Sequence, residues 1–271
     1  MSLEPLQPTL FVSHGSPMFA LEPGITGPAL GEWARALPHK PSGIVLMSPH
    51  WMAEAPLVMT HATPATWHDF GGFPDPLYRL QYPAPGDPGL ARKVLSLFRE
   101  AGLPAGEDPR RPFDHGAWVP LRHLFPAADI PVVQVALPAH ADAGEVWAMG
   151  HALAKLRAAG VLFVGSGSMT HNLAEFFSGD REPAPYVDAF SRWVEAIVTR
   201  GDRATLLDYR AQAPHARRAH PTEEHFLPIF FTLGAAGWGE DGALPVEVIS
   251  REVMYGRLAM DAFAVGSVQP G

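Results

Sequence analysis

The chain has 271 residues and a mass of 29.3 kDa. Hydrophobic residues make up 47% and charged residues 18%, which is typical of a globular protein with a substantial core. Because the net charge is −8 at pH 7 and there is no basic tract, we expect no nucleic-acid partner.

The chain has no cysteine, which excludes disulfides, thiolate zinc sites, iron–sulfur clusters and cysteine nucleophiles. The first residues lack the positive region of a secretory signal, and the longest apolar stretch, 226–238, is too short to span a bilayer. We therefore expect a soluble, cytoplasmic protein without a membrane partner. Metal binding and acid–base chemistry must come from carboxylates and the thirteen histidines.

Short apolar runs alternate along the chain with segments of helical apolar spacing. Strands are expected at residues 9–13, 43–48, 131–137, 161–165 and 245–250. Helices are expected at residues 28–37, 88–101, 143–158, 184–200 and 223–236. This alternation predicts an α/β fold in one domain, residues 1–271, with a central parallel or mixed sheet flanked by helices on both faces.

Residues 62–87 depart from this pattern, because they are rich in proline, glycine and aromatic residues. A long irregular segment within a compact domain is usually functional or disordered, and its aromatic content argues against disorder. We expect a packed loop, which either walls a pocket or covers an exposed edge of the sheet.

Three predicted strands are each followed by a histidine, namely His14, His50 and His171. Ligands of open α/β sheets bind beyond the carboxyl ends of the strands, so three histidines at that edge predict a site. His115 lies in a turn-like setting beside Asp114, and Asp114 alone could simply cap a helix over residues 118–124.

A further histidine, His225, follows Thr222, Glu223 and Glu224, which suit the cap and first turn of a helix. A histidine is disfavoured at the positive end of a helix unless its ring is neutral. Binding to a metal would hold the imidazole neutral. The pattern therefore indicates that His225 is a metal ligand.

Seven motifs occur in an order that resembles the DOPA 4,5-dioxygenase-like branch of the class III extradiol ring-cleavage dioxygenases, relatives of protocatechuate 4,5-dioxygenase catalytic subunits. They are Ser13-His14-Gly15-Ser16-Pro17, Ser48-Pro49-His50-Trp51, His68-Asp69-Phe70 with Tyr82-Pro83-Ala84-Pro85-Gly86, Asp114-His115-Gly116, Thr170-His171-Asn172, Glu224-His225-Phe226-Leu227-Pro228 and Met254-Tyr255-Gly256. The resemblance extends over nearly the whole chain.

The resemblance implies an α/β fold and a mononuclear metal site at His14, His50 and His225, with His171 and His115 as catalytic groups. Protocatechuate-type members use two histidines and a carboxylate, so Glu223 and Glu224 stay open as alternatives for the third ligand.

The activity implied is oxygen-dependent opening of a catechol such as DOPA, with the catechol and O2 as the small-molecule partners. His171 is the candidate acid–base group and His115 the candidate hydrogen-bond partner of the oxygen species. Fe(II) is expected for turnover. Zn(II) is expected in isolated protein, with His171 as a possible fourth ligand, because imidazole also suits zinc and zinc lies above Fe(II) in the affinity order.

Two other functions fit the same residues. Three histidines and an open water position also describe a zinc hydrolase, and a non-catalytic binding protein could share the fold. The candidates for binding a substrate carboxylate are Arg79, Arg251 and Arg257.

Overall fold

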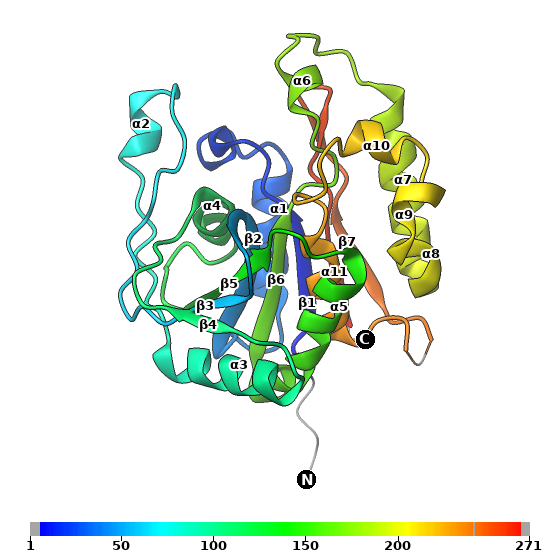
Figure 1. Ribbon diagram of the computed structural model, residues 1–271. Coiled ribbons are helices and arrows are strands. Elements are labelled where there is room, and N and C mark those ends of the chain that lie inside the picture. The colour runs from blue at the N-terminus through cyan, green and yellow to red at the C-terminus, as the bar shows by residue number, and fades with distance from the viewer. Residues whose placement is uncertain (1–5, 241, 267–271) are drawn as a thin grey trace.

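The computed structural model describes residues 6–240 and 242–266. Within these residues, eight strands form one mixed sheet in the order β4-β3-β5-β2-β6-β1-β10-β7, and β8 and β9 form a separate pair (Figure 1). The strands are β1 Thr9–Ser13, β2 Gly43–Ala53, β3 Leu57–Met59, β4 Gly106–Asp108, β5 Val132–Pro138, β6 Val161–Gly167, β7 Val246–Ser250, β8 Val253–Met254, β9 Leu258–Ala259 and β10 Ala262–Val265.

The centre of the sheet is parallel. β2 pairs in parallel with both β5 and β6, and β6 pairs in parallel with β1. Strand β10 runs antiparallel to β1 and β7, and β3 runs antiparallel to β5. The carboxyl ends of β1, β2 and β6 therefore meet at one edge of the sheet, which lies at the top of Figure 1.

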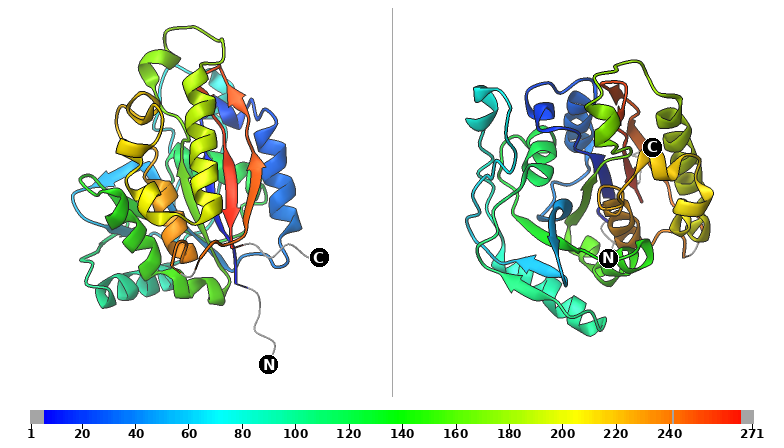
Figure 2. Two further views of the ribbon diagram at one scale, coloured as in Figure 1. Left: turned by 90° about the vertical axis from the view of Figure 1, so that its right-hand side faces the viewer. Right: turned by 45° about the horizontal axis from the view of Figure 1, so that its top comes forward.

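Helices cover both faces of the sheet, which explains why the central strands are apolar on both sides. One core cluster joins the sheet to α3, α5, α7 and α11, and the other joins it to α1 and α4. Figure 2 (left) shows α7 and α1 on opposite sides of β7 and β10. These helices are α1 Thr26–Ala36, α3 Pro88–Glu100, α4 His115–Leu124, α5 Ala143–Ala152, α7 Pro185–Arg200 and α11 Pro228–Ala236.

Shorter helical segments connect these elements. They are η1 Pro17–Ala20, α2 Asp75–Tyr78, η2 Ala154–Ala159, α6 Leu173–Phe176, α8 Arg203–Leu207, α9 Tyr209–Gln212 and α10 Ala216–Ala219. No helix in the described part of the chain is long and apolar enough to cross a bilayer.

The predicted α/β fold is confirmed, and all five predicted strands form. β2 extends beyond the predicted residue 48 to Ala53, because the chain keeps pairing with β5 after a register shift. The short strands β3, β4 and β10 were not predicted. Three or four residues give too little periodicity to be distinguished from loop.

Two predicted helices are wrong in extent. The helix expected over 143–158 ends at Ala152 and is followed by the 3-10 segment η2, which stops at Gly160 in a left-handed conformation with φ 80°. The helix expected over 223–236 begins only at Pro228. Proline is favoured at the first position of a helix because it has no N–H to leave unpaired. Because the helix begins at Pro228, Thr222 lies too far ahead of it to be its cap.

Residues 62–87 form a packed irregular segment around the short helix α2, as predicted. The segment is tied to α4 and its flanks. The Trp67 carbonyl accepts a hydrogen bond from Trp118 Nε1 at 3.0 Å, and the Tyr82 hydroxyl donates to the Phe125 carbonyl at 3.1 Å.

Candidate metal centre

The histidines predicted from strand ends lie together at the carboxyl edge of the sheet, which faces forward in Figure 2 (right). His14 directly follows β1, and His50 lies in β2 where its register with β5 shifts between Ser48 and Met52. His171 lies beyond the end of β6. His225 precedes α11, and His115 is the first residue of α4.

The rings of His14, His50 and His225 lie close to one another. Their ring centroids are 5.0 Å apart for His14 and His50, 5.1 Å for His50 and His225, and 5.5 Å for His14 and His225. Three imidazoles bound to one ion through nitrogens at about 2.1 Å would have centroids roughly 4.5–5.2 Å apart. His14 and His50 are therefore spaced to share a divalent ion, as are His50 and His225, while the His14–His225 pair lies slightly beyond this range. The potential ligand atoms form two groups, each within 4.8 Å: His14, His50 and His115, and His171, Glu224 and His225.

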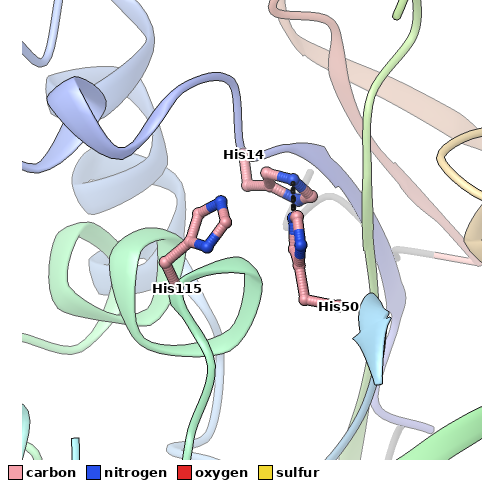
Figure 3. Close-up of side chains that lie close together, drawn as sticks. All are labelled: His14, His50 and His115. Carbon is pink, nitrogen blue, oxygen red and sulfur yellow. Dashed lines mark hydrogen bonds between the residues drawn. The ribbon is translucent and has the colours of Figure 1, made fainter. Parts of the chain in front are cut away.

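The nearest nitrogens support the same interpretation. His14 Nε2 and His50 Nε2 lie 3.1 Å apart (Figure 3). Two nitrogens bound at right angles to one ion, each at about 2.1 Å, would lie about 3.0 Å apart. The pair therefore fits two neighbouring ligands of one ion.

Each outer nitrogen of His14 and His225 has an acceptor. The Ser166 hydroxyl donates to the Gly116 carbonyl, so at its 3.0 Å contact with His14 Nδ1 it accepts the ring hydrogen. His225 Nδ1 donates to Glu224 Oε1 at 2.9 Å. A carboxylate or hydroxyl on Nδ1 leaves the Nε2 lone pair free for a metal.

Burial and neighbouring rings keep these histidines uncharged. Burial, with the charges of neighbouring histidines, holds the pKa of His14 and of His225 well below 6.5. Burial lowers the pKa of His50 and of His171 to about 4. Neutral imidazole is the form that binds metal, so the donor set suits a divalent cation.

The comparisons with known proteins agree with this geometry. The family of the catalytic LigB subunit of aromatic ring-opening dioxygenase matches residues 8–259. The chain is 37% identical to the 4,5-DOPA dioxygenase extradiol of Escherichia coli K12, over 96% of this chain and 94% of that protein. The chain belongs to the LigB family.

A plant relative and a solved structure extend the comparison. The chain is 38% identical to the 4,5-DOPA dioxygenase extradiol of Beta vulgaris, over 86% of this chain and 88% of that protein. The crystal structure of an uncharacterized protein from Escherichia coli K12 matches with a TM-score of 0.79 and 32% identity, covering 96% of this chain and 100% of that one. The protein is thus a metal-dependent extradiol ring-cleaving dioxygenase, which confirms the family, fold and enzyme class predicted from the motifs.

In this LigB-family enzyme, His115 and His171 lie beside the three histidines. The His115 ring is 3.9 Å from the His50 ring between centroids, and Figure 3 shows it pointing toward His14 and His50. The His171 ring stacks on His225 with centroids 3.4 Å apart. Both catalytic candidates therefore contact candidate ligands.

Of the two acids left open as a third ligand, Glu224 bonds His225, as described above, and Glu223 faces away. Glu223 accepts a hydrogen bond from the Tyr209 hydroxyl at 2.6 Å and pairs with Arg210 at 3.3 Å. Neither acid occupies a first turn of α11, so the helix-cap argument for His225 does not hold, although His225 lies in the cluster.

The sequence did not identify the carboxylates beneath the LigB-family site. Buried Asp114 caps α4 through Ala117 N, as expected, but it also accepts hydrogen bonds from Ser48, Gln134 and Arg111 at 2.7–2.8 Å. Asp69 bonds His115. Its only sequence signal was its place in the His68-Asp69-Phe70 motif.

Gly116 lets α4 approach β2. A Cβ at this position would clash with the Ser48 hydroxyl and would lie 2.9 Å from His50 Cδ2. A side chain here would therefore displace a candidate ligand, which gives the Asp114-His115-Gly116 motif a steric basis.

The three arginines considered for a substrate carboxylate differ in their contacts. Arg257 is buried and pairs with Asp180 at 2.5 Å, and Arg251 pairs with Glu195 at 2.7 Å. Arg79 ends α2 and is exposed, and it makes no ion pair among the described residues. Among the three, Arg79 is therefore the available cation.

Proposed function

We propose that the substrate is a catechol carrying an amino-acid side chain, such as DOPA. The support is that the relatives with the highest identity quoted above are each called a 4,5-DOPA dioxygenase extradiol. The aromatic segment 62–87 lies beside the site and suits a flat ring. Family membership favours this activity over the zinc hydrolase and the non-catalytic binding protein.

In this proposal His14, His50 and His225 hold the metal, with Fe(II) as the ion for turnover and Zn(II) as the ion acquired on isolation. The proximity of the three neutral rings supports this ligand set. A bound divalent ion would supply Lewis acidity and open positions for the two catechol oxygens and O2.

The other two histidines handle protons. The neutral ring of His171 accepts a proton from a catechol hydroxyl and later returns it to an oxygen of the ring-opened product. His115 directs a ring nitrogen toward the reacting oxygens from the opposite side of the cluster. Buried surroundings strengthen the hydrogen bonds that His171 and His115 make to the substrate oxygens, because water competes weakly there.

The test is turnover under controlled metal and oxygen. Metal-free protein loaded anaerobically with Fe(II), with its iron content measured, is mixed with DOPA or simple catechols and then exposed to air. We expect a yellow semialdehyde with DOPA and consumption of one O2 per ring. Absence of product across the whole panel, at full iron occupancy, would refute the proposal.

A further inference from the structure

Asp69 connects the irregular segment 62–87 to the catalytic histidines. Its Oδ1 accepts two hydrogen bonds from one residue, from the backbone N–H of His115 at 2.9 Å and from His115 Nδ1 at 3.0 Å. Its other oxygen, Oδ2, lies 3.9 Å from His50 Nδ1. The side chains of Asp69 and His115 are each only 8% exposed, so water competes little for these bonds.

We propose that Asp69 is a positioning residue that fixes the tautomer and ring orientation of His115. An ionised carboxylate only accepts hydrogen bonds, so His115 Nδ1 must carry the hydrogen in this pair. The remaining nitrogen, Nε2, is then the atom that His115 presents to the reacting oxygens. This inference rests on the catalytic role proposed above for His115.

The position of His115 in the fold explains why an anchor is needed. His115 is the first residue of α4. The N-terminal end of a helix carries free N–H groups and a partial positive charge, so it gives a ring N–H no acceptor. A free imidazole there could rotate by half a turn and present carbon instead of Nε2. The two bonds to one Asp69 oxygen hold backbone and ring together and disfavour that rotation.

The segment that carries Asp69 is itself fixed on both sides. Before it, Trp67 is bonded to α4 through the Trp118 indole. After it, the Phe70 ring packs edge-on against the His115 ring with centroids 5.6 Å apart, and also contacts Tyr78. A shift of the aromatic residues around Phe70 therefore moves Asp69. The packing of segment 62–87 and the orientation of the His115 ring are thus coupled.

His171 offers an internal contrast. Within the described residues its ring makes no hydrogen bond to a side chain or carbonyl, and it is held by stacking on His225. The two catalytic histidines thus differ in kind. One has a defined hydrogen position, and the other is a neutral ring held only by packing.

The first test reads the tautomer directly. Long-range ¹H–¹⁵N spectra of histidine-labelled, metal-free protein report which ring nitrogen carries hydrogen, and His115→Gln identifies the His115 signals. We expect the Nδ1–H tautomer in wild type and a mixture or the Nε2–H tautomer in Asp69→Ala. A wild-type His115 with hydrogen on Nε2, or an unchanged spectrum in Asp69→Ala, would overturn the proposal.

The second test measures steady-state kinetics of Fe(II)-loaded variants. Asp69→Ala and the nearly isosteric Asp69→Leu, which both lack an acceptor, should lower kcat by about 10- to 100-fold, the usual effect of removing such a supporting partner. KM and iron content should stay within about twofold. Asp75→Asn removes an exposed charge from the same segment and is the matched control, with kcat unchanged.

The two tests separate the present proposal from the proposed function. If wild type opens no catechol, the activity proposal fails while the tautomer spectra still decide the role of Asp69. If Asp69→Ala loses its fold, the nearly isosteric Asp69→Leu decides by kcat. Unchanged kcat in a folded, iron-loaded Asp69→Leu enzyme, or loss of iron in parallel with kcat, would refute positioning of His115.

Discussion

The imidazole of His171 lies face to face with that of His225, with ring planes only 10° apart. Each nitrogen lone pair lies in the plane of its own ring, so two parallel rings stacked 3.4 Å apart cannot both hold one ion in their planes unless one ring turns. His171 is therefore held against a candidate ligand while its own nitrogens remain available to a substrate. This geometry favours an acid–base role over permanent ligation.

The roles of the histidines can be separated by substitution. His115→Ala should leave metal occupancy near wild type while turnover falls by roughly 10²- to 10⁴-fold, the usual contribution of one positioned acid–base group. His14→Ala and His50→Ala should instead lose the metal. Elemental analysis beside O2-uptake rates checks this, and equal metal loss in all three variants would contradict the assignment.

Zinc should be found in protein isolated without added metal. Three neutral histidines suit zinc, which binds such sites more tightly than Fe(II), and His171 is near enough to turn in as a fourth ligand. A crystal structure of this form should show zinc at His14, His50 and His225, and the protein should be inactive until reloaded with Fe(II). A metal bound by Glu223 or Glu224 in place of His225 would show that the third ligand is misassigned.

Glu224 should contribute to metal affinity although it is not proposed as a ligand. The Glu224 carboxylate accepts the Nδ1 hydrogen of His225 and its charge makes the ring a stronger ligand, so the loss of that charge in Glu224→Gln should weaken metal binding by about 10- to 100-fold. Glu223→Gln is the matched control, since Glu223 bonds Tyr209 instead. Competition with a coloured chelator measures both affinities, and equal effects in the two variants would argue against this role.

Buried Asp261 should make stability depend on pH. Burial raises its pKa from 3.8 to about 7, so folding favours the protonated acid. Its stabilising contribution is complete below about pH 4 and is lost as pH rises through about 7, amounting to no more than about 4 kcal/mol. In urea unfolding from pH 4 to 8, the free energy of unfolding of Asp261→Asn should increase relative to that of wild type as pH rises. A constant difference would exclude this titration.

The sheet was predictable because its central strands are continuous apolar runs. The meeting of the histidines was predictable because each follows such a run, and ligands bind beyond the carboxyl ends of parallel strands. The pairing of Asp69 with His115 was not, because the two residues are 46 positions apart and their contact depends on how segment 62–87 packs on α4. The start of α11 was misjudged because acids near Thr222 resemble a helix cap. Pro228 fixes the true start.

The candidate ligands come from nearly opposite ends of the chain, His14 after the first strand and His225 before the last long helix. An unfolded chain therefore contains no preformed pair of neighbouring ligands, and the ion binds tightly only to the folded protein. By mass action, metal at a hundred times its dissociation constant would add about 2.7 kcal/mol to the free energy of unfolding. Iron supply in the cell would then set how long the enzyme resists unfolding and proteolysis as well as how fast it turns over.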